Sequence, residues 1–485
     1  MSQEKLQRPG QFVLDVCTLH TSGNAVIDLK GGGNVMHLTF FEDMLTPYVQ
    51  GSIVIQNQGG ASNIGPIIGQ ETLELVIRTP TMKEDHEILS FTGKNRLHIT
   101  RINSKRRIGK GTEFISLEFF SGEWVRNSRT RISKTLRGSV SNIANTLLND
   151  VGCFKKRYIE SSGENKQYIA PNIRPFDCIN HLVGQAVSTG GGDHPERSFM
   201  FWENKRGYHF RSLNSIVKGN TDVTNKDLPT HFYRHKDKIK YGDGGAIDVI
   251  DRLYAITDFE TRHSDRFHNH IMGQLGSSLI SHNMYTKSYA RTNFNYLDQF
   301  NRWTHMNSHK RPKSTYPIYS ESPDVFGKRV SDYETKTFLY PENQTQAGFD
   351  AGMQDPNGNY IYSPYESHSW VQKRRGQLGI LFGGVSISLF AHGNTFVNAG
   401  DMVDITLPYF GIKDADNPTG KDRFLNGNML VHQIAHEFDV ANFEHKMKLE
   451  CVSDDLEEEL PKTDEDSPEG ELSPKNEEIY EDFYL

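Results

Sequence analysis

The chain has 485 residues, of which 36% are hydrophobic and 24% charged, with a formal net charge of −7. That length allows three or four domains. No apolar run approaches the roughly 18 residues that a membrane helix needs, and no apolar stretch follows basic residues near the N-terminus. We therefore expect neither a secretory signal nor insertion into a membrane.

The charge is unevenly distributed along the chain. The segment Asp454–Leu485 holds fourteen Asp or Glu and two Lys, a local charge of −12, so the remaining chain carries about +5. A weakly charged body argues against a dedicated nucleic-acid binder, which needs a concentrated basic face. The cysteines are scattered and form no CxxC pair, which favours buried free thiols in a reducing compartment. They are Cys17, Cys153, Cys178 and Cys451.

The first 125 residues predict a module of short strands. Gly51–Gln56 and Gly69–Pro80 are alternating segments, and Leu97–Ser121 is typical of a long hairpin with polar residues in its loop. In its second half Ile115, Leu117 and Phe119 alternate with polar residues, the pattern of a strand with one buried face. Gly, Pro and Asn between closely spaced strands favour a small antiparallel barrel or sandwich.

Helical periodicity replaces this pattern after residue 125. One helix is expected with Ser139 or Ser141 as its N-cap and Gly152 as its stop, and another begins at Pro175. A hairpin turning at Asn204–Gly207 follows. These elements predict a compact α+β insert.

The next stretch is rich in Tyr, Asn, His and Ser. Leu253–Phe259 predicts a strand, and His270–Tyr289 predicts two short strands around a turn at Gly273–Gly276. Between about 300 and 370 we expect long loops with short strands.

The later part of the chain repeats the first module. Gly384–Phe390 and Gly400–Pro408 are alternating segments, and Met429–Ser453 predicts a second long hairpin. This hairpin aligns with Leu97–Ser121 without a gap at an offset of 332 positions, although only four aligned residues are identical. Two half-buried hairpins can look alike by chance. If the repeat is genuine, it is a device for symmetry, since three copies of a two-module chain present six similar modules. The aligned positions include Leu97 with Met429, Ile99 with Val431, Ile102 with Ile434, Ile115 with Met447, Leu117 with Leu449, Glu118 with Glu450 and Ser121 with Ser453.

No catalytic, cofactor or metal motif is found. The chain has no Walker A loop, no GxGxxG after a strand and no GxSxG elbow. Two of its histidines, His268 and His270, would point the same way on a strand, but no third ligand lies at a recognisable spacing. We expect no catalytic residue, no cofactor and no metal, and predict that the protein is not an enzyme.

The acidic segment at the end of the sequence is poor in aliphatic residues, so we expect it to be largely disordered when alone. It finishes with an aromatic cluster, which predicts docking on a partner. An inert solubilising tail is the alternative. The cluster consists of Ile479, Tyr480, Phe483, Tyr484 and Leu485.

Two motifs in the α+β insert resemble the central hub protein of phage contractile-tail baseplates. The first is Asn-x-Arg-Pro-Phe, opening a helix; the second is a Phe-rich hairpin ending in Phe-Arg-Ser-Leu. Phe41–Gln58 and Phe424–Phe438 are similar to strands of the same family. The motif residues here are Asn172, Arg174, Pro175, Phe176, Phe210, Arg211, Ser212 and Leu213.

The resemblance implies a mainly β fold with an α+β insert and two tail-tube-like antiparallel β-barrel domains per chain. Three chains would form a trimeric ring with pseudo-sixfold symmetry. The ring would adapt a six-fold tail tube to a three-fold central spike and let DNA pass without binding it specifically. Implied partners are a second and third copy, a separate trimeric spike protein, and tail tube and baseplate wedge proteins. The protein would lie in the virion, in the tail baseplate, after assembly in the host cytoplasm.

The domain limits follow from the same reasoning. We predict a first tube-like barrel in 1–125, an α+β insert in 126–225, the start of the second barrel in 226–260, a loop-rich β insert in 261–375, the rest of the second barrel in 376–453, and the acidic tail in 454–485. We also predict that the hairpins 97–121 and 429–453 pair across subunits and line the channel.

The sequence leaves two alternative functions to consider. A carbohydrate-active or receptor-binding β protein of a virion would need paired carboxylates or an aromatic platform. The related spike base of a type VI secretion system normally continues into a needle in the same chain, which we do not expect here.

Overall fold

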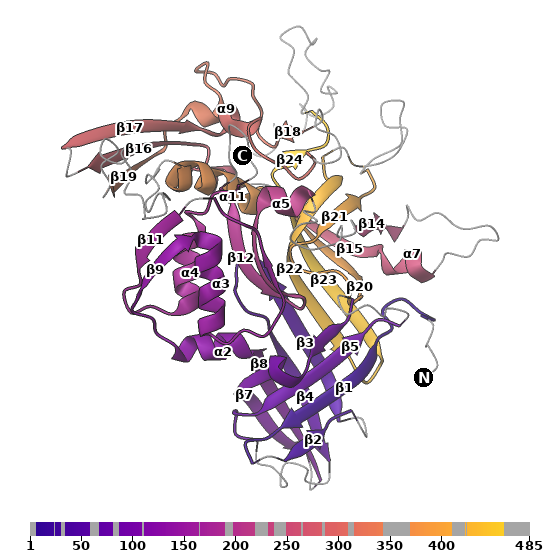
Figure 1. The fold of residues 1–485 in the computed structure, drawn as a ribbon. Coiled ribbons are helices and arrows are strands. Elements are labelled where there is room, and N and C mark those ends of the chain that lie inside the picture. Colours follow the sequence, from indigo (N-terminus) through magenta and orange to yellow (C-terminus); the bar gives the residue numbers. More distant parts are fainter. Residues whose placement is uncertain are drawn as a thin grey trace, which may run out of the picture.

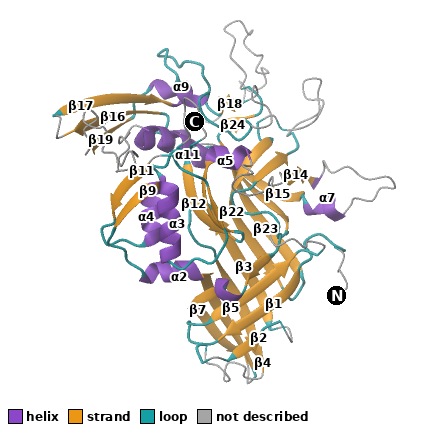
Figure 2. Ribbon diagram, in the orientation of Figure 1, coloured by secondary structure: helices purple, strands orange, loops and turns teal. Residues whose placement is uncertain are grey.

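The computed structural model consists mainly of strands, with helices gathered on one side (Figures 1 and 2). It describes residues 6–459 except 24, 31–33, 59–66, 81–86, 109–110, 164, 190–196, 219–230, 237–248, 263–264, 284–286, 309–314, 343–368, 410–421 and 423. Among these residues, hydrogen bonds join seventeen strands into one extended sheet. The predicted tail-docking cluster, Ile479 to Leu485, lies outside the described residues.

The second module is a closed barrel of six strands. Its hydrogen-bonded order is β14-β21-β22-β23-β20-β15 and back to β14. β14 runs parallel to both of its neighbours, and the other pairs are antiparallel. Closure removes the free strand edges around most of the barrel. The strands are β14 (His231–His235), β15 (Ala255–Arg262), β20 (Val385–His392), β21 (Met402–Thr406), β22 (Gly427–Asp439) and β23 (Glu444–Ser453).

The first module has the same strand order, β1-β5-β7-β8-β4-β3. Here β1 runs antiparallel to β5, and within the described residues no pairing joins β1 to β3. The predicted alternation is confirmed, since Leu73, Leu75 and Ile77 are all buried in the core of this barrel. The strands are β1 (Val13–His20), β2 (Val26–Asp28), β3 (Val35–Asp43), β4 (Gln50–Gln58), β5 (Thr72–Arg78), β6 (Leu89–Phe91), β7 (Leu97–Ile108) and β8 (Thr112–Ser121).

The α+β insert contains both predicted helices. Ser139 caps α3 (Val140–Asp150) by accepting a hydrogen bond from the Asn142 backbone N–H at 3.3 Å, and Gly152 follows with φ +70°. Pro175 is the first residue of α4 (Pro175–Val183). The predicted hairpin is also present. The remaining elements are α2 (Gly122–Arg129), β9 (Thr135–Ser139), β10 (Arg157–Ile159), β11 (Asn165–Ile169), β12 (Phe199–Asn204), β13 (Gly207–Ser212) and α5 (Leu213–Lys218).

The second insert differs from its prediction at the start. Instead of a strand, α8 (Arg266–Ile271) carries His268 and His270, and Asp265 caps it by accepting from the His268 backbone N–H at 2.9 Å. The strand pair lies later, in β16 (Gly276–Asn283) and β17 (Ser288–Asn295). A helical pair at i and i+2 points in different directions, so the chelating arrangement considered for the strand does not exist.

Short elements complete this region. They are α7 (Val249–Leu253), α9 (Tyr296–Phe300), β18 (Tyr316–Pro317), a 3-10 turn (Val330–Asp332), β19 (Lys336–Glu342), a π-helical stretch (Ser369–Arg374), α11 (Arg375–Gly383) and β24 (Asp455–Leu456). The range predicted for the rest of the second barrel thus begins with a helix. Glycines at 376 and 379 allow α11 to approach closely, since a Cβ on Gly376 would lie 2.6 Å from the Phe294 ring. The domain limits themselves stay a prediction.

The two barrels join lengthwise within one chain. Figure 1 shows the yellow β22 beside the indigo β3, and seven residue pairs connect these strands, from Gln433 opposite Asp43 to Asp439 opposite His37. We call this pairing the intrachain junction. It corrects the prediction that the hairpin 429–453 pairs across subunits, because β22 pairs with β3 and β23 with β20 of the same chain. None of the helices in the described part of the chain is long and apolar enough to cross a membrane, and all four cysteines are buried and free.

Candidate assembly interface

The two long hairpins are the same structure, down to an irregularity in their pairing. In β7–β8, Ile99 lies opposite Phe119, and the register then shifts so that Arg101 lies opposite Glu118. In β22–β23, Val431 lies opposite Cys451, and Gln433 then lies opposite Glu450. Each bulge leaves one residue unopposed, Thr100 or His432, and these two are 332 positions apart. A matched bulge is a much stronger sign of equivalence than four identical residues.

A second matched bulge lies in the neighbouring strands. Between β3 and β4 the register shifts between Val35 and His37, and between β15 and β20 it shifts between Ile256 and Asp258. Each pair stands at the same place relative to its hairpin, because Ser52 of β4 faces Glu118 and Ser388 of β20 faces Glu450. The repeat therefore covers four consecutive strands on each side: β7-β8-β4-β3 and β22-β23-β20-β15. We call these the first and second sheet units.

The gapless sequence alignment conceals one real difference. β7 has another bulge, between Ile102 and Ser104, that β22 lacks. The extra residue is compensated in the loop, which spans 109–111 in the first hairpin and 440–443 in the second. As a result, Lys105, Arg106 and Arg107 correspond to His436, Glu437 and Phe438.

Three aromatic side chains near the tip of the second hairpin are buried, although the turn residues Ala441 to Phe443 are exposed. Phe438 belongs to the core of the first barrel, and its ring lies 4.0 Å from that of His445 between centroids. His436 Nδ1 lies 3.1 Å from His445 Nε2. Burial lowers the pKa of His436 to about 3 and that of His445 well below its ordinary value, so both rings are neutral. These three side chains are part of the folded core rather than of a free surface.

The corresponding part of the first hairpin is ionic, with exposed basic side chains around the buried Glu113. Glu113, at the position of His445, accepts a hydrogen bond from Arg107 Nε at 2.9 Å and lies 3.6 Å from Lys105 Nζ. The hydrogen bond from Arg107 contributes most to lowering the pKa of Glu113. From Arg101 to Ile108, every residue except the half-buried Ile102 is exposed. Three basic side chains therefore stand on a strand edge that has no partner strand among the described residues.

A buried polar network holds the insert at the intrachain junction. Glu42 of β3 accepts from the Lys205 backbone N–H at 2.7 Å and from the Ala399 backbone N–H at 2.9 Å. Arg206 makes a two-pronged ion pair with Asp401, at 2.8 and 3.2 Å. Burial raises the pKa of Glu42 to about 7. The turn of the β12–β13 hairpin thus connects both barrels and fixes how they meet.

The family-motif residues lie inside the insert, away from the strand edges. Phe176 and Phe210 are in its core, and the Phe176 backbone N–H donates to Asn127 Oδ1 at 2.9 Å. Arg211 donates to the Ser215 carbonyl at 2.6 Å, and Ser212 donates to Glu160 at 3.0 Å. Arg174 occupies the N-cap position of α4 before Pro175, and Asn172 adopts a left-handed backbone with φ 54°. The structure thus gives Phe176, Phe210, Arg211 and Ser212 packing or hydrogen-bonding contacts within the insert.

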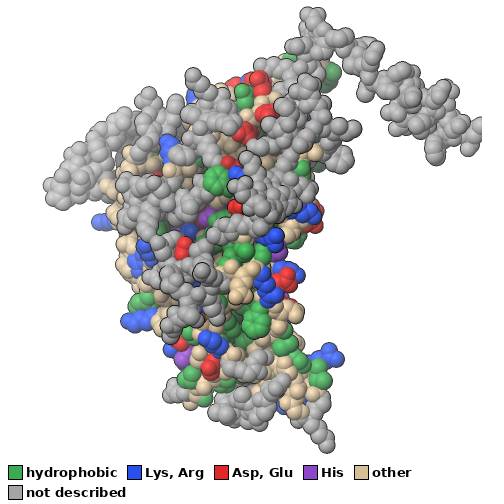
Figure 3. Space-filling view, turned by 90° about the vertical axis from the view of Figure 1, so that its right-hand side faces the viewer, with side chains coloured by type: hydrophobic (Ala, Val, Ile, Leu, Met, Phe, Trp, Pro, Cys, Tyr) green, Lys and Arg blue, Asp and Glu red, His purple; other side chains and the backbone are tan. Residues whose placement is uncertain are grey.

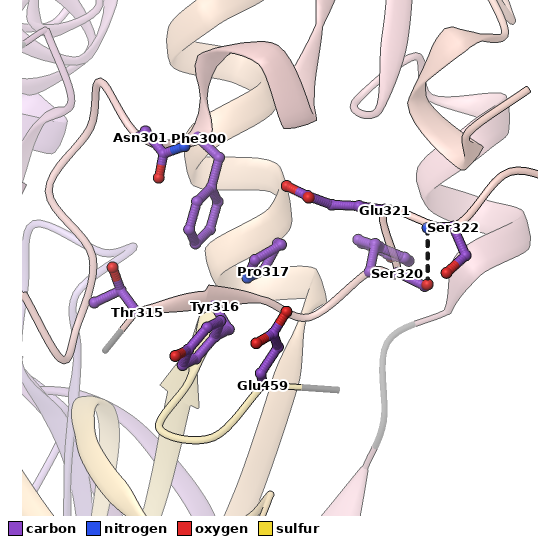
Figure 4. A pocket seen from close by; sticks show the side chains of 10 residues that line it. Phe300, Asn301, Thr315, Tyr316, Pro317, Ser320, Glu321, Ser322 and Glu459 are labelled. Atoms are coloured by element: carbon purple, nitrogen blue, oxygen red, sulfur yellow. Dashed lines mark hydrogen bonds between the residues drawn. The ribbon is translucent and has the colours of Figure 1, made fainter. Parts of the chain in front are cut away.

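A pocket of about 490 Å³ lies where the described chain comes to its last residue. Figure 4 shows Tyr316 beside Glu459, with Phe300 on the other side of the strand and Glu321 further along. Behind it, His305 Nδ1 lies 2.8 Å from Asp454 Oδ2, and the pKa of His305 is raised to about 9 because Asp454 outweighs the effect of burial. These contacts anchor the start of the acidic segment.

A larger cavity, of about 1070 Å³, lies where β1 and β3 fail to pair. Phe12, Val35 and Phe443 contribute apolar lining, and Arg8 and Lys30 contribute charge. Hydrophobic side chains gather with scattered Lys and Arg on the face turned away from the α+β insert (Figure 3). Among the described residues there is no group of three or more His, Cys, Asp or Glu side chains that could hold a metal ion.

No protein-family model and no curated protein matches the chain. Several solved structures do, at low identity. The 43 kDa tail protein of prophage MuSo2 from Shewanella oneidensis is 10% identical, with a TM-score of 0.47 over 90% of this chain and 98% of its own. The tail protein from Neisseria meningitidis MC58 is 11% identical, with a TM-score of 0.48 over 92% and 97%. A type VI secretion component of E. coli is 7% identical, with a TM-score of 0.41 over 87% and 73%. All three TM-scores are below 0.5, so these likenesses add no argument about function.

Sequence reasoning located both hairpins but missed the opposite edge of the sheet. Asp258 and Glu260 of β15 are exposed acidic residues on an edge that has no partner strand in the described part of the chain, and the predicted strand Leu253–Phe259 included only Asp258. Their alternation with the half-buried Phe259 was the available signal.

Proposed function

We propose that the protein is a structural hub at the base of a contractile tail. Three copies form a ring in which six barrels match the six-fold tail tube, while the assembly keeps the three-fold symmetry of a central spike. The hub holds the spike, continues the tube lumen and lets DNA pass. Its role is mechanical rather than enzymatic, and its place is the virion baseplate.

The observation that carries this proposal is the duplicated sheet unit with its two matched bulges. A closed ring of identical chains has the symmetry of its copy number. Only a chain with two equivalent units lets three copies present six equivalent surfaces. The insert motifs that resemble the hub family point the same way.

The hairpin faces also suit a DNA channel, if they line one as predicted. On the side turned away from the core, β22–β23 carries Glu437, Lys446, Lys448 and Glu450, and Lys448 pairs with Glu450 at 2.6 Å. Such a balanced face does not accumulate the positive charge that would retain phosphate.

Mass measurement of the purified protein, alone and with the candidate spike protein, tests the proposal. We expect a trimer in at least the second sample, and a ring with six similar lobes by electron microscopy. A chain that stays monomeric with the spike present would refute the hub assignment. A ring with the two hairpins on its outer rim would refute their predicted place in the channel.

The pocket in Figure 4 favours one second candidate, a carbohydrate-binding role for the same virion protein. The half-buried Tyr316 offers a ring for sugar stacking, and Glu321 and Glu459 offer carboxylates. A glycan array with the wild type and with Tyr316→Ala tests it. Saccharide binding that the substitution abolishes would support this role, and an array without signal would dismiss it.

A further inference from the structure

The intrachain junction shows how one sheet unit attaches to the next. The first unit finishes with β3, the second begins with β22, and the two strands pair antiparallel over seven residues. Gln433 Nε2 also donates to Asp43 Oδ2 at 3.0 Å. The last strand of one sheet unit can therefore pair with the first strand of another.

The two outermost strands of the combined sheet correspond to the two strands that meet in the intrachain junction. The strand that corresponds to β22 is β7, and the strand that corresponds to β3 is β15. Within the described residues, β7 pairs with β5 only at Leu97 and His98, and β15 pairs with β14 only at Ala255 and Ile256. Beyond those points one edge of each strand has no partner strand among these residues, and such edges are usually covered or paired.

The same chain cannot join its own two ends. β7 and β15 are the first and last strands of the hydrogen-bonded series β7-β8-β4-β3-β22-β23-β20-β15. Figure 1 shows them on opposite sides of the molecule, β7 at the lower left and β15 at the right. The partner for each edge must come from another copy. A head-to-tail contact of this kind generates a ring when its rotation closes.

We infer that β7 of one copy pairs antiparallel with β15 of the next, through the register that the intrachain junction already uses. The inference rests on the proposed ring and specifies how its copies meet. Thr39 faces Glu437 in the intrachain junction. Glu260 corresponds to Thr39, because Thr39 faces Ser52 and Glu260 faces Ser388.

The residue that corresponds to Glu437 is Arg106, since each lies opposite an equivalent residue of the adjoining hairpin strand. The contact between copies therefore places Arg106 of one copy opposite Glu260 of the next. Asp258 falls opposite Ile108 in the same register, one residue from Arg107.

The charges on the two edges are complementary. The β7 edge exposes Arg101, Lys105, Arg106 and Arg107, whereas the β15 edge exposes two acids, Asp258 and Glu260, and one base, Arg262, which falls opposite the uncharged Ser104 in this register. Directly opposed unlike charges stabilise an antiparallel pair, and like charges destabilise it. The same pairing also neutralises basic residues that would otherwise face the channel. Burial dominates the intrachain junction, while charge dominates the contact between copies.

Cysteine cross-linking tests the register. Arg106→Cys and Glu260→Cys are made in one chain, and a short bismaleimide is added to the assembled protein, whose own four cysteines are buried. We expect covalent dimers and trimers on a denaturing gel. A matched control combines Glu260→Cys with Ile169→Cys, a residue of β11 that is 69% exposed and lies off both edges, and should give none. A trimer by mass that does not cross-link would overturn this inference and leave the hub proposal standing. Failure to trimerise with the spike would refute the hub proposal itself.

Charge reversal tests the electrostatic part. Arg106→Glu and Glu260→Arg should each weaken association at low salt about tenfold per contact, and the double variant should restore it. Arg137→Glu, an exposed substitution on β9, is the matched control and should leave the trimer intact. Circular dichroism establishes that each variant is folded. Single variants that assemble like the wild type, or a double variant that fails to recover, would refute the Arg106–Glu260 pair.

Discussion

The tips of the two long hairpins show how one scaffold serves two purposes. At corresponding positions the first tip has Lys105, Arg107 and Glu113, and the second has His436, Phe438 and His445. The second set is buried against the first barrel, whereas in the first set Lys105 and Arg107 stand in solvent and only Glu113, which they cover, is buried. The two tips therefore share one backbone geometry, and their side chains differ in whether they pack into the protein's own core.

The largest effect is expected from truncating the buried tip. Phe438→Ala should lower the free energy of unfolding by about 3–5 kcal/mol, because it removes a fully buried ring from the core of the first barrel. Arg107→Ala, the matched change in the exposed tip, should change it by less than about 0.5 kcal/mol. Urea denaturation followed by circular dichroism measures both. Equal losses in the two variants would contradict the contrast between the tips.

The second-largest effect is expected from acidification, which should affect the two tips differently. The folded-state pKa of His436 is about 3, below its ordinary value of 6.5. The neutral ring therefore makes its full contribution to the free energy of unfolding above about pH 6.5, and this contribution is lost as the pH falls. Between pH 7 and pH 5 this one group should cost about 2 kcal/mol of stability. The pKa of Glu113 is also lowered, but from 4.5, so the exposed tip keeps its ion pairs at pH 5.

The measurement is urea denaturation at pH 7 and pH 5 for the wild type and His436→Gln. The variant should be less stable at pH 7 but should lose about 2 kcal/mol less on acidification. Glu113→Gln is the control and should follow the wild type over this range. An unchanged pH dependence in His436→Gln would show that the ring does not titrate as proposed.

A smaller effect is expected at the intrachain junction. Gln433→Ala removes the hydrogen bond to Asp43 and should cost about 1 kcal/mol. Its counterpart Arg101 lies on the edge of β7 that is unpaired within the described residues, so Arg101→Ala should leave the stability of the monomer unchanged, as measured by thermal denaturation of dilute protein. A similar loss in both would mean that the free edge already has a partner within the chain.

The smallest effect belongs to the exposed ion cluster. Glu113→Gln should change stability very little, because its partners Lys105 and Arg107 are exposed to solvent and ion pairs to them are largely screened. Raising the salt concentration to about 1 M should abolish even this difference, since the screening length falls to about 3 Å. A loss that persists at high salt would argue that Glu113 has a packing role like that of His445.

Local signals in the sequence predicted local structure well. Ser139 and Gly152 marked the ends of α3, Pro175 marked the start of α4, and alternation located both hairpins. α8 could have been found in the same way, since Asp265 is an N-cap residue. It was missed because the following Gly273 and Gly276 suggested a hairpin turn.

Pairing between distant strands was beyond such signals. The alternation of His231–His235 gives no direction, so the sequence did not reveal that β14 runs parallel to its neighbours. The extra bulge in β7 was hidden because the shorter loop restores the length. A role in strand pairing can be inferred for the edge residues Asp258 and Glu260 only from the intrachain junction, which shows which strands can pair.

The intrachain junction has a further consequence for how assembly responds to dilution. Its two strands belong to one polypeptide, so their local concentration is fixed by the connecting chain and does not fall when the protein is diluted. Contacts between copies have no such tether. In a three-copy ring, the three intrachain junctions would form in every molecule as it folds. Only the three contacts between copies would depend on the protein concentration.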